Sequence, residues 1–159
     1  MTIKVRRVVT GHDAKGKAIV TIDEMAKNIV TKRPGYSSCV IWSTEKFPSD
    51  NADETDGATR NVATSTPNGT VFRVVEYEPG VAPRMHRTDS LDYAIVIAGE
   101  LEMELDDGVT VHLKAGDVVV QRGTVHNWIN RGPQNCVIAY VLTGAEPLVV
   151  GAKKLDAFG

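Results

Sequence analysis

The strongest constraint on the fold is an alternation of apolar and polar residues that runs from residue 70 to residue 143. It occurs in short runs, such as TVFRVVEY, LDYAIVIA and CVIAYVLTG, that are separated by Gly, Pro, Asn and Asp. A period of two places successive side chains on opposite faces of a β-strand, and frequent turns are typical of sandwiches and barrels rather than of βαβ units. The sequence therefore predicts an all-β protein with its barrel core at residues 66–145.

The rest of the chain is predicted to flank this core. Residues 1–65 would supply N-terminal strands that pack on the barrel or on a dimer partner, at 3–9 and 17–22 around the turn GHDAKG and again near 40–47. Residues 146–159 would form a C-terminal tail.

Three further segments carry weaker local signals. The stretch 48–61 is acidic, polar and rich in turn residues, which predicts a long loop or a lid over the barrel mouth. We interpret DEMAKNIV at 23–30 and AKKLDAF at 152–158 as short helical turns.

Composition argues against several classes of protein. A chain of 159 residues with 42% hydrophobic residues is long enough for one domain with a proper core. Eighteen basic and twenty acidic residues leave a net charge of −2, which favours a small molecule over nucleic acid or an anionic membrane as partner. Cys39 and Cys136 lack CxxC spacing, so we expect reduced thiols. No apolar run is long enough to cross a bilayer, and we expect a cytoplasmic protein.

Two histidines lie forty residues apart in glycine-bounded, strand-like segments. His86 occurs in PGVAPRMHRTDSLDY and His126 in GDVVVQRGTVHNWIN. The chain has only two other histidines, His12 in a polar turn and His112 in a strand without a partner motif, and both are predicted to point outward. An imidazole pair from distant strands predicts a site inside the barrel.

The residues around the first histidine follow a spaced pattern. Gly80 precedes His86 by five intervening residues, Thr88 and Asp92 follow, and Gly99 closes the segment. This pattern resembles the first motif of the cupin superfamily, which runs Gly, five residues, His, any residue, His, three or four residues, Glu, six residues, Gly. Thr88 stands at the position of the second family histidine, and Asp92 stands at that of the glutamate.

The second segment matches more closely. Gly116-Asp117 opens it, Gly123 is followed by His126, and Asn130 closes it. It is similar to the second cupin motif, with Gln121 at the family's proline position and a run that is one residue shorter. The resemblance implies a cupin-type jelly-roll β-barrel with an N-terminal strand extension, similar to single-domain cupins of small-molecule pathways. It also implies a homodimer, because cupins commonly exchange N-terminal strands.

The resemblance implies a metal site formed by His86, Asp92 and His126. Two imidazoles and one carboxylate are the facial set that leaves open positions on Fe and related ions, so Fe, Zn, Mn or Ni is expected. Thr88 removes one family ligand, and the aspartate is shorter than the glutamate it replaces. A metal-free pocket, in which a histidine acts as general acid or base, stays open as an alternative, as does an inert pocket.

Other residues are candidates for binding substrate or lining the site. Thr88 lies beside the ligands, and Trp128 follows His126 by two residues, so it should project into the same interior. Arg73 shares a strand face with Val75 and Tyr77; an outward arginine is the commoner case, whereas an inward one would bind a substrate carboxylate or enolate. Tyr93 should point away from Asp92, and the alternating glutamates should face solvent, namely Glu100, Glu102 and Glu104.

The expected function is that of a small-molecule enzyme with its site inside the barrel. We favour a metal-assisted lyase that decarboxylates or dehydrates a small oxo or aromatic compound, because the thinned ligand set suits a substrate-polarising ion better than a tightly held redox iron. The alternatives are a non-haem Fe(II) dioxygenase and a non-catalytic ligand-binding cupin. No basic helix-turn-helix segment points to a DNA-binding regulator.

Overall fold

The computed structural model describes residues 3–159 and is built of short strands. The strands in chain order are β1 (Arg6–His12), β2 (Ala18–Met25), β3 (Ile29–Arg33), β4 (Tyr36–Ser43), β5 (Thr70–Tyr77), β6 (Ser90–Ala98), β7 (Glu100–Glu104), β8 (Thr110–Lys114), β9 (Val118–Arg122), β10 (Asn127–Ile129), β11 (Cys136–Gly144), β12 (Val149–Val150) and β13 (Lys153–Lys154). A single 3-10 turn, Asp106–Gly108, joins β7 to β8. The all-β prediction is confirmed.

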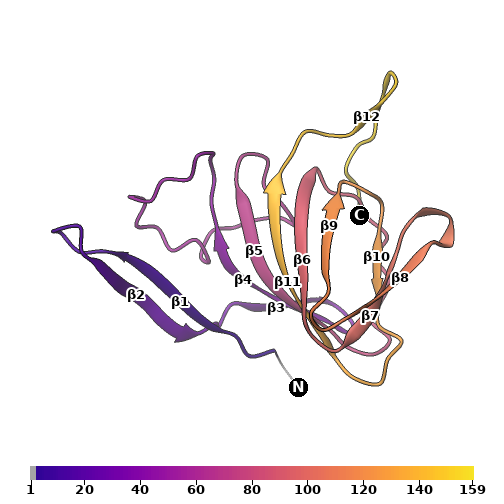
Figure 1. The fold of residues 1–159 in the computed structure, drawn as a ribbon, viewed down its shortest axis with the longest axis horizontal. Helices are drawn as coiled ribbons and strands as arrows, with labels where there is room; N and C mark the ends of the chain where they lie inside the picture. The colour runs from indigo at the N-terminus through magenta and orange to yellow at the C-terminus, as the bar shows by residue number, and fades with distance from the viewer. Residues whose placement is uncertain (1–2) are drawn as a thin grey trace.

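Two sheets form the body of the molecule. The larger has the strand order β3-β4-β5-β11-β6-β9 and the smaller the order β10-β7-β8 (Figure 1). The main cluster of buried side chains takes members from both sheets, among them Val75, Ile138, Leu101 and Trp128. The core therefore lies between the sheets, as in a jelly-roll barrel.

The alternation in the sequence explains how the core is assembled. In β11, the residues Cys136, Ile138, Tyr140 and Leu142 are buried, whereas the residues between them are partly exposed. β11 pairs with β5 on one side and with β6 on the other. Because side chains alternate between the two faces of a strand, β11 directs these four side chains to the interior, on the same side as the buried side chains of β5 and β6.

Both helical predictions are wrong. Residues 23–30 contain the end of β2 and the start of β3, and the register of β1 with β2 aligns Arg7 with Glu24. At the C-terminal end, β12 and β13 form a hairpin, and Phe158 forms an antiparallel bridge with Arg87. In both places cross-strand pairing satisfies the backbone, and this tertiary pairing overrides a weak local helical preference.

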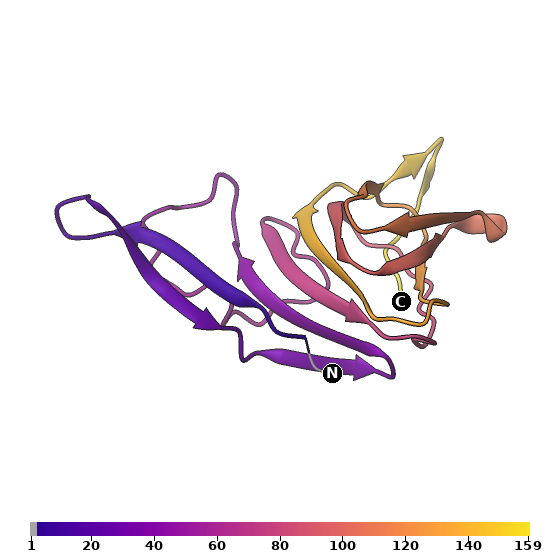
Figure 2. The same cartoon turned by 60° about the horizontal axis from the view of Figure 1, so that its bottom comes forward.

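The hairpin β1–β2 projects from the body, whereas β3 and β4 extend the larger sheet (Figures 1 and 2). The stretch 48–61 is a loop, as predicted, and it is anchored at the base of the hairpin. There Arg7 donates hydrogen bonds to Asp56 at 2.5 and 2.8 Å, and Ser43 donates one to the Gly57 carbonyl at 2.7 Å. The antiparallel pairing of β1 with β2 confirms the predicted hairpin around GHDAKG.

Among residues 3–159, no helix is long and apolar enough to cross a membrane.

Candidate active site

His86 and His126 lie side by side, although forty residues separate them. Their main chains form an antiparallel bridge in which each amide donates to the other's carbonyl, at 3.0 Å from His86 and 2.9 Å from His126. The imidazole centroids are 4.1 Å apart. Both residues are buried, with exposed fractions of 7% and 3%. The predicted pairing of these two rings is therefore present in the structure.

Each imidazole is oriented by a hydrogen bond between its Nδ1 and a main-chain carbonyl. Nδ1 of His86 lies 2.9 Å from the Arg84 carbonyl, and Nδ1 of His126 lies 3.0 Å from the Thr124 carbonyl. Because a carbonyl oxygen only accepts, Nδ1 carries the proton in each neutral ring, and Nε2 keeps its lone pair. Burial, followed by the charge of His126, lowers the pKa of His86 to about 4, and burial lowers the pKa of His126. Both rings are therefore neutral at pH 7.

Asp92 lines the same pocket from β6. Its carboxyl group accepts a hydrogen bond from Ser90 Oγ at 2.5 Å and a longer one from Thr88 Oγ1 at 3.5 Å. Burial is the largest effect on this group and raises the pKa of Asp92 to about 6. Thr88 thus contacts the carboxyl group that was predicted as a metal ligand.

The side chains that could donate to a metal ion here are the two imidazoles. Within the described part of the chain, no group of three or more His, Cys, Asp or Glu side chains is arranged to hold a metal ion. Each neutral imidazole keeps an Nε2 lone pair that could bind a divalent ion, but the Asp92 carboxyl group is hydrogen-bonded to the hydroxyl groups of Ser90 and Thr88. As they stand, these residues do not fit the three-ligand site that the cupin motifs imply.

Arg73, whose orientation the sequence leaves open, points inward. Its side chain is 7% exposed, it lines the pocket with Val75 and Tyr77, and Nη2 donates to the carbonyls of Ala63 at 2.6 Å and Thr64 at 2.9 Å. The statistical preference for an outward arginine fails because β5 is an interior strand of the sheet, whose other face is also buried. Solvent is therefore available on neither face.

An aromatic wall closes the bottom of the pocket. The Trp128 ring packs at 5.7 Å from His126 and at 5.5 Å from Tyr140, both edge to face. The Tyr77 and Tyr140 hydroxyl groups are hydrogen-bonded at 3.0 Å, and burial raises both pKa values. The prediction that Trp128 projects into the interior is confirmed.

Several pocket residues escaped the sequence analysis. Arg33, Tyr36, Thr64 and Arg84 also line the pocket, and they come from segments whose strand pairing was not predicted. Two signals pointed toward others: Tyr77 shares a strand face with Arg73, and Tyr140 follows the alternation of its strand. Arg84 stands two residues before His86, but it lies in no regular strand and so had no predictable orientation.

The loop 48–61 does not line the pocket. The segment just after it does, through Thr64, and the carbonyls of Ala63 and Thr64 accept hydrogen bonds from Arg73. Tyr93 points outward as predicted, with 45% exposure, and the His112 side chain is exposed beside Glu100. Of the three alternating glutamates, Glu100 is exposed, whereas Glu102 and Glu104 are half-buried. His12 is also exposed.

The cupin resemblance is supported by comparison with known proteins. A model of the cupin domain matches residues 73–150. The chain is 34% identical to phomopsin biosynthesis cluster protein C' of Diaporthe leptostromiformis, over 94% of this chain and 83% of the relative. The chain belongs to the cupin family. This cupin is also 32% identical to the cupin-domain-containing oxidoreductase fogC of Aspergillus ruber, over 98% of its own length and 80% of that protein.

A solved structure has the same fold at lower identity. The polyketide cyclase RemF from Streptomyces resistomycificus superposes with a TM-score of 0.52 and 17% identity, and the match covers 83% of this cupin and 78% of that chain. This likeness concerns the fold alone.

Proposed function

We propose that this cupin is an enzyme of small-molecule metabolism whose reaction takes place at the imidazole pair inside the barrel. The observation that carries the proposal is that two neutral rings face one pocket, each with Nδ1 held by a carbonyl. Two oriented Nε2 lone pairs beside a polar pocket are suited to moving a proton on a bound substrate. Relatives whose names place them in biosynthesis clusters support a role in a small-molecule pathway.

The proposed reaction is a lyase step, the dehydration of a small hydroxylated oxo compound. Nε2 of one histidine takes the proton from the carbon next to the oxo group, and the resulting enolate is stabilised by Arg73 or Arg84. A carbon–carbon double bond then forms as the neighbouring carbon–oxygen bond breaks. The imidazolium returns its proton to the leaving hydroxide, which departs as water, so both rings end neutral.

Two other reactions compete with dehydration at the same residues. Decarboxylation of an oxo acid would release CO₂ instead of water, and a proton from solvent, relayed by one imidazole, would end on the carbanion. Relatives named as oxidoreductases favour the second candidate, an oxidation that consumes an electron acceptor such as dioxygen. Product analysis and oxygen uptake separate the three.

The experiment is a turnover screen on hydroxylated oxo compounds with His86→Ala and His126→Ala variants. Removing a proton-transfer group lowers rates by about 10²- to 10⁴-fold, so both variants should lose at least 100-fold. His112→Ala is the matched control, because this histidine is exposed and pairs only with Glu100. Unchanged turnover in either pocket variant would refute the role of the imidazole pair, and ligand binding with no turnover on any compound would favour the non-catalytic cupin.

A metal site at His86, Asp92 and His126 stays a separate proposal. It requires the Asp92 carboxyl group to leave Ser90 and Thr88 and turn toward the two Nε2 atoms. The test is metal content after reconstitution with Fe, Zn, Mn or Ni. Stoichiometric metal that Asp92→Ala and His86→Ala each abolish would support the three-ligand site, whereas a wild type without metal would refute it.

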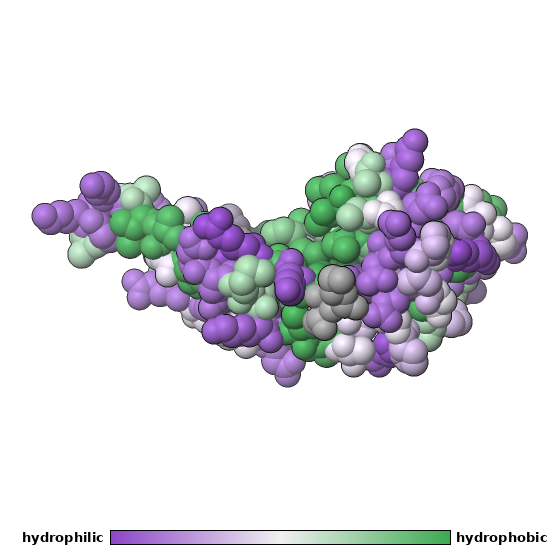
Figure 3. All heavy atoms as spheres, turned by 90° about the horizontal axis from the view of Figure 1, so that it is seen from below, coloured by the Kyte–Doolittle hydropathy of each residue, from purple (hydrophilic) through white to green (hydrophobic). Residues whose placement is uncertain are grey.

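We also propose that the protein is a homodimer. Adjacent strands β6 and β9 expose a cross-strand apolar patch on their outer face, consisting of Tyr93, Ile95, Ile97, Val118 and Val120. The projecting hairpin exposes Val8 and Val20 by 51% and 58%, and Figure 3 shows hydrophobic side chains along it and in the hollow beside the barrel. An isolated two-stranded hairpin is marginal in water, so a second copy that covers both surfaces would stabilise it.

Sedimentation equilibrium tests this assembly. Val118→Lys should shift the protein toward the monomer, whereas Val109→Lys, at a residue that is equally apolar and 54% exposed outside that patch, should not. A monomeric wild type at micromolar concentration would contradict the proposal.

A further inference from the structure

Three arginines converge on the imidazole pocket from different parts of the chain. Arg33 comes from the end of β3, Arg73 from β5, and Arg84 from the segment before His86. Among the residues that the structure describes, none of the three forms an ion pair with an aspartate or glutamate side chain. No carboxyl side chain of the described residues therefore neutralises the positive charge of this pocket by direct contact.

The hydrogen bonds of these guanidinium groups go to main-chain oxygens and to one hydroxyl oxygen. Arg33 donates to the Ala82 carbonyl at 3.0 Å and stacks over the Tyr36 ring. Arg84 donates to the main-chain oxygen of Gly159 at 2.5 Å and, at 3.5 Å, to Thr64 Oγ1. The buried Nε of Arg73 has no hydrogen-bond partner.

This arrangement is energetically unfavourable without an anion. Arginine stays protonated in proteins, and a buried charge without a counter-charge is costly. The burial of Arg84 and the nearby charges of Arg33 and Arg73 lower the pKa of Arg84, as expected for cations crowded together. The only carboxyl group of the pocket, Asp92, is bonded to Ser90 and Thr88. A bound anion would satisfy the free Nε of Arg73 and offset this charge.

The dimensions of the space define the size of that anion. The interior cavity at the histidines has a volume of about 40 Å³, which is enough for about three waters and therefore for a single carboxylate group. Beside it lies a groove of about 630 Å³ that shares Thr64 and Arg84 with the cavity. The rest of a larger ligand would lie in this groove.

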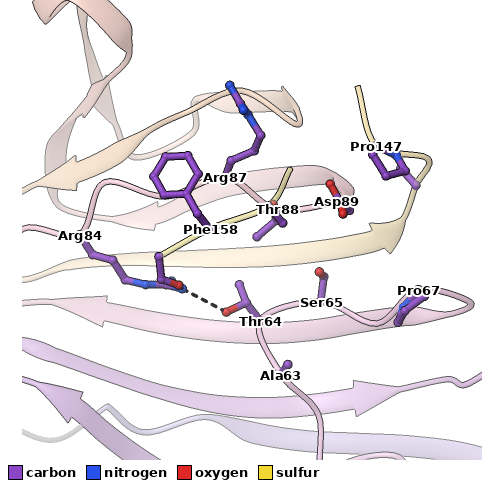
Figure 4. A pocket seen from close by; sticks show the side chains of 13 residues that line it. Ala63, Thr64, Ser65, Pro67, Arg84, Arg87, Thr88, Asp89, Pro147 and Phe158 are labelled. Atoms are coloured by element: carbon purple, nitrogen blue, oxygen red, sulfur yellow. Dashed lines mark hydrogen bonds between the residues drawn. The ribbon is translucent and has the colours of Figure 1, made fainter. Parts of the chain in front are cut away.

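The walls of the groove are largely apolar. In Figure 4, Arg84 reaches toward Thr64 at its inner end, and Phe158, Pro67 and Pro147 lie around the space. Ala63, Ala145 and Ala157 complete the apolar lining, and the polar side chains of Ser65, Arg87, Thr88 and Asp89 take a smaller share of the wall. Such a surface is suited to a hydrocarbon body rather than to a sugar or a nucleotide.

We propose that the ligand is an organic acid with an apolar body. Its carboxylate enters the cavity between Arg73 and Arg84, where it replaces the Gly159 oxygen as a partner of Arg84, and its carbon chain lies in the groove. This inference rests on the proposed function to the extent that the same acid is the substrate at the imidazole pair. A carboxylate at Arg84 places the adjoining carbons next to His86 and His126.

The test is calorimetric titration with octanoate, its neutral analogue octanamide, and acetate. Octanoate should bind at least 10-fold more tightly than octanamide, because only the acid offers a charge to the arginines. It should also bind at least 10-fold more tightly than acetate, because only the longer chain fills the groove. Equal affinity for octanoate and octanamide would overturn the proposal.

Substitutions separate the two halves of the site. Arg84→Gln should weaken octanoate binding at least 10-fold and abolish the preference for acid over amide, and Arg73→Lys should weaken it while keeping the charge. Ala145→Trp, which fills the groove, should weaken octanoate binding but not acetate binding. Arg6→Gln, at an exposed arginine paired with Asp23, is the control and should change nothing. Full octanoate affinity in Arg84→Gln would refute the site.

Binding and turnover can fail independently. If octanoate binds in an Arg84-dependent manner but no hydroxylated oxo compound is turned over, the acid site stands and the lyase fails. If a neutral compound is turned over in a histidine-dependent manner and octanoate does not bind, the lyase stands and the acid site fails.

Discussion

The two glycines that bound the first cupin motif offer a matched test of the fold. Gly80 and Gly99 have nearly the same backbone conformation, with φ of 73° and 74°. Their surroundings differ. A Cβ at Gly80 would meet nothing within 4 Å, whereas a Cβ at Gly99 would lie 2.4 Å from the Asn135 oxygen and 2.9 Å from Cys136 Cα. The same substitution therefore separates conformational strain from steric overlap.

The expected magnitudes follow from these contacts. Gly80→Ala should lower the free energy of unfolding by about 1 to 2 kcal/mol, the cost of a left-handed conformation for a residue with a side chain. Gly99→Ala has the same cost plus that of displacing the main chain at the start of β11, where overpacking typically costs about 1–3 kcal/mol. The second variant should be less stable than the first by about 2 kcal/mol, or roughly 4–8 °C in Tm.

Urea unfolding followed by tryptophan fluorescence measures both variants against the wild type. The slopes of the unfolding curves should agree, so that midpoint differences report stability. If the two variants differ by less than about 0.5 kcal/mol, or if Gly80→Ala is the less stable, the role assigned to the close approach of Gly99 to β11 is wrong.

Three further predictions concern residues outside the pocket. Asn130→Ala should cost about 2–4 kcal/mol of unfolding free energy in urea, because it removes a buried amide that donates to two main-chain carbonyls and leaves them unsatisfied. The hydrogen bond from Arg7 holds the pKa of Asp56 below its ordinary value of 3.8. The contribution of this ion pair to the free energy of unfolding is therefore complete above about pH 5. That contribution is lost as pH falls through the lowered pKa of Asp56. The stability advantage of wild type over Asp56→Asn should therefore be constant from pH 7 to 5 and shrink below about pH 4. An advantage that grew on acidification would contradict this. Cys39 and Cys136 are 1% and 0% exposed and burial raises both thiol pKa values, so a thiol reagent should modify them only in denaturant, and rapid modification of the native protein would refute that burial.

The strand pattern of the barrel could be predicted because it depends on a local property. In β6 and β11 burial alternates from residue to residue, as the period of two requires when one face of a strand packs on the core. The same rule correctly placed Trp128 inside and Tyr93 outside. The glycine-bounded motifs also predicted that His86 and His126 would meet, since they resemble a family with that arrangement.

Local signals were insufficient where a segment's structure depends on a distant partner. Residues 23–30 and 152–158 were predicted to be helical turns. Instead, Asp23 to Met25 pair with β1 and Phe158 forms a bridge with Arg87, both distant in the sequence, whereas Lys153 and Lys154 form a short hairpin with β12. Nothing in the composition of the tail indicates that Phe158 would lie against Arg87. Pairing over such distances is decided by the whole chain, because each strand must satisfy its backbone hydrogen bonds somewhere.

The sequence by itself thus determined the fold class, the barrel core and the identity of the two imidazoles. Only the tertiary structure decided what surrounds them. It turned Arg73 inward because β5 is covered on both faces, it brought Arg33 and Arg84 into the same pocket, and it bound Asp92 to hydroxyl groups. Periodicity determines which face of a strand is buried, but the charge of a pocket depends on which distant strands the completed barrel brings together.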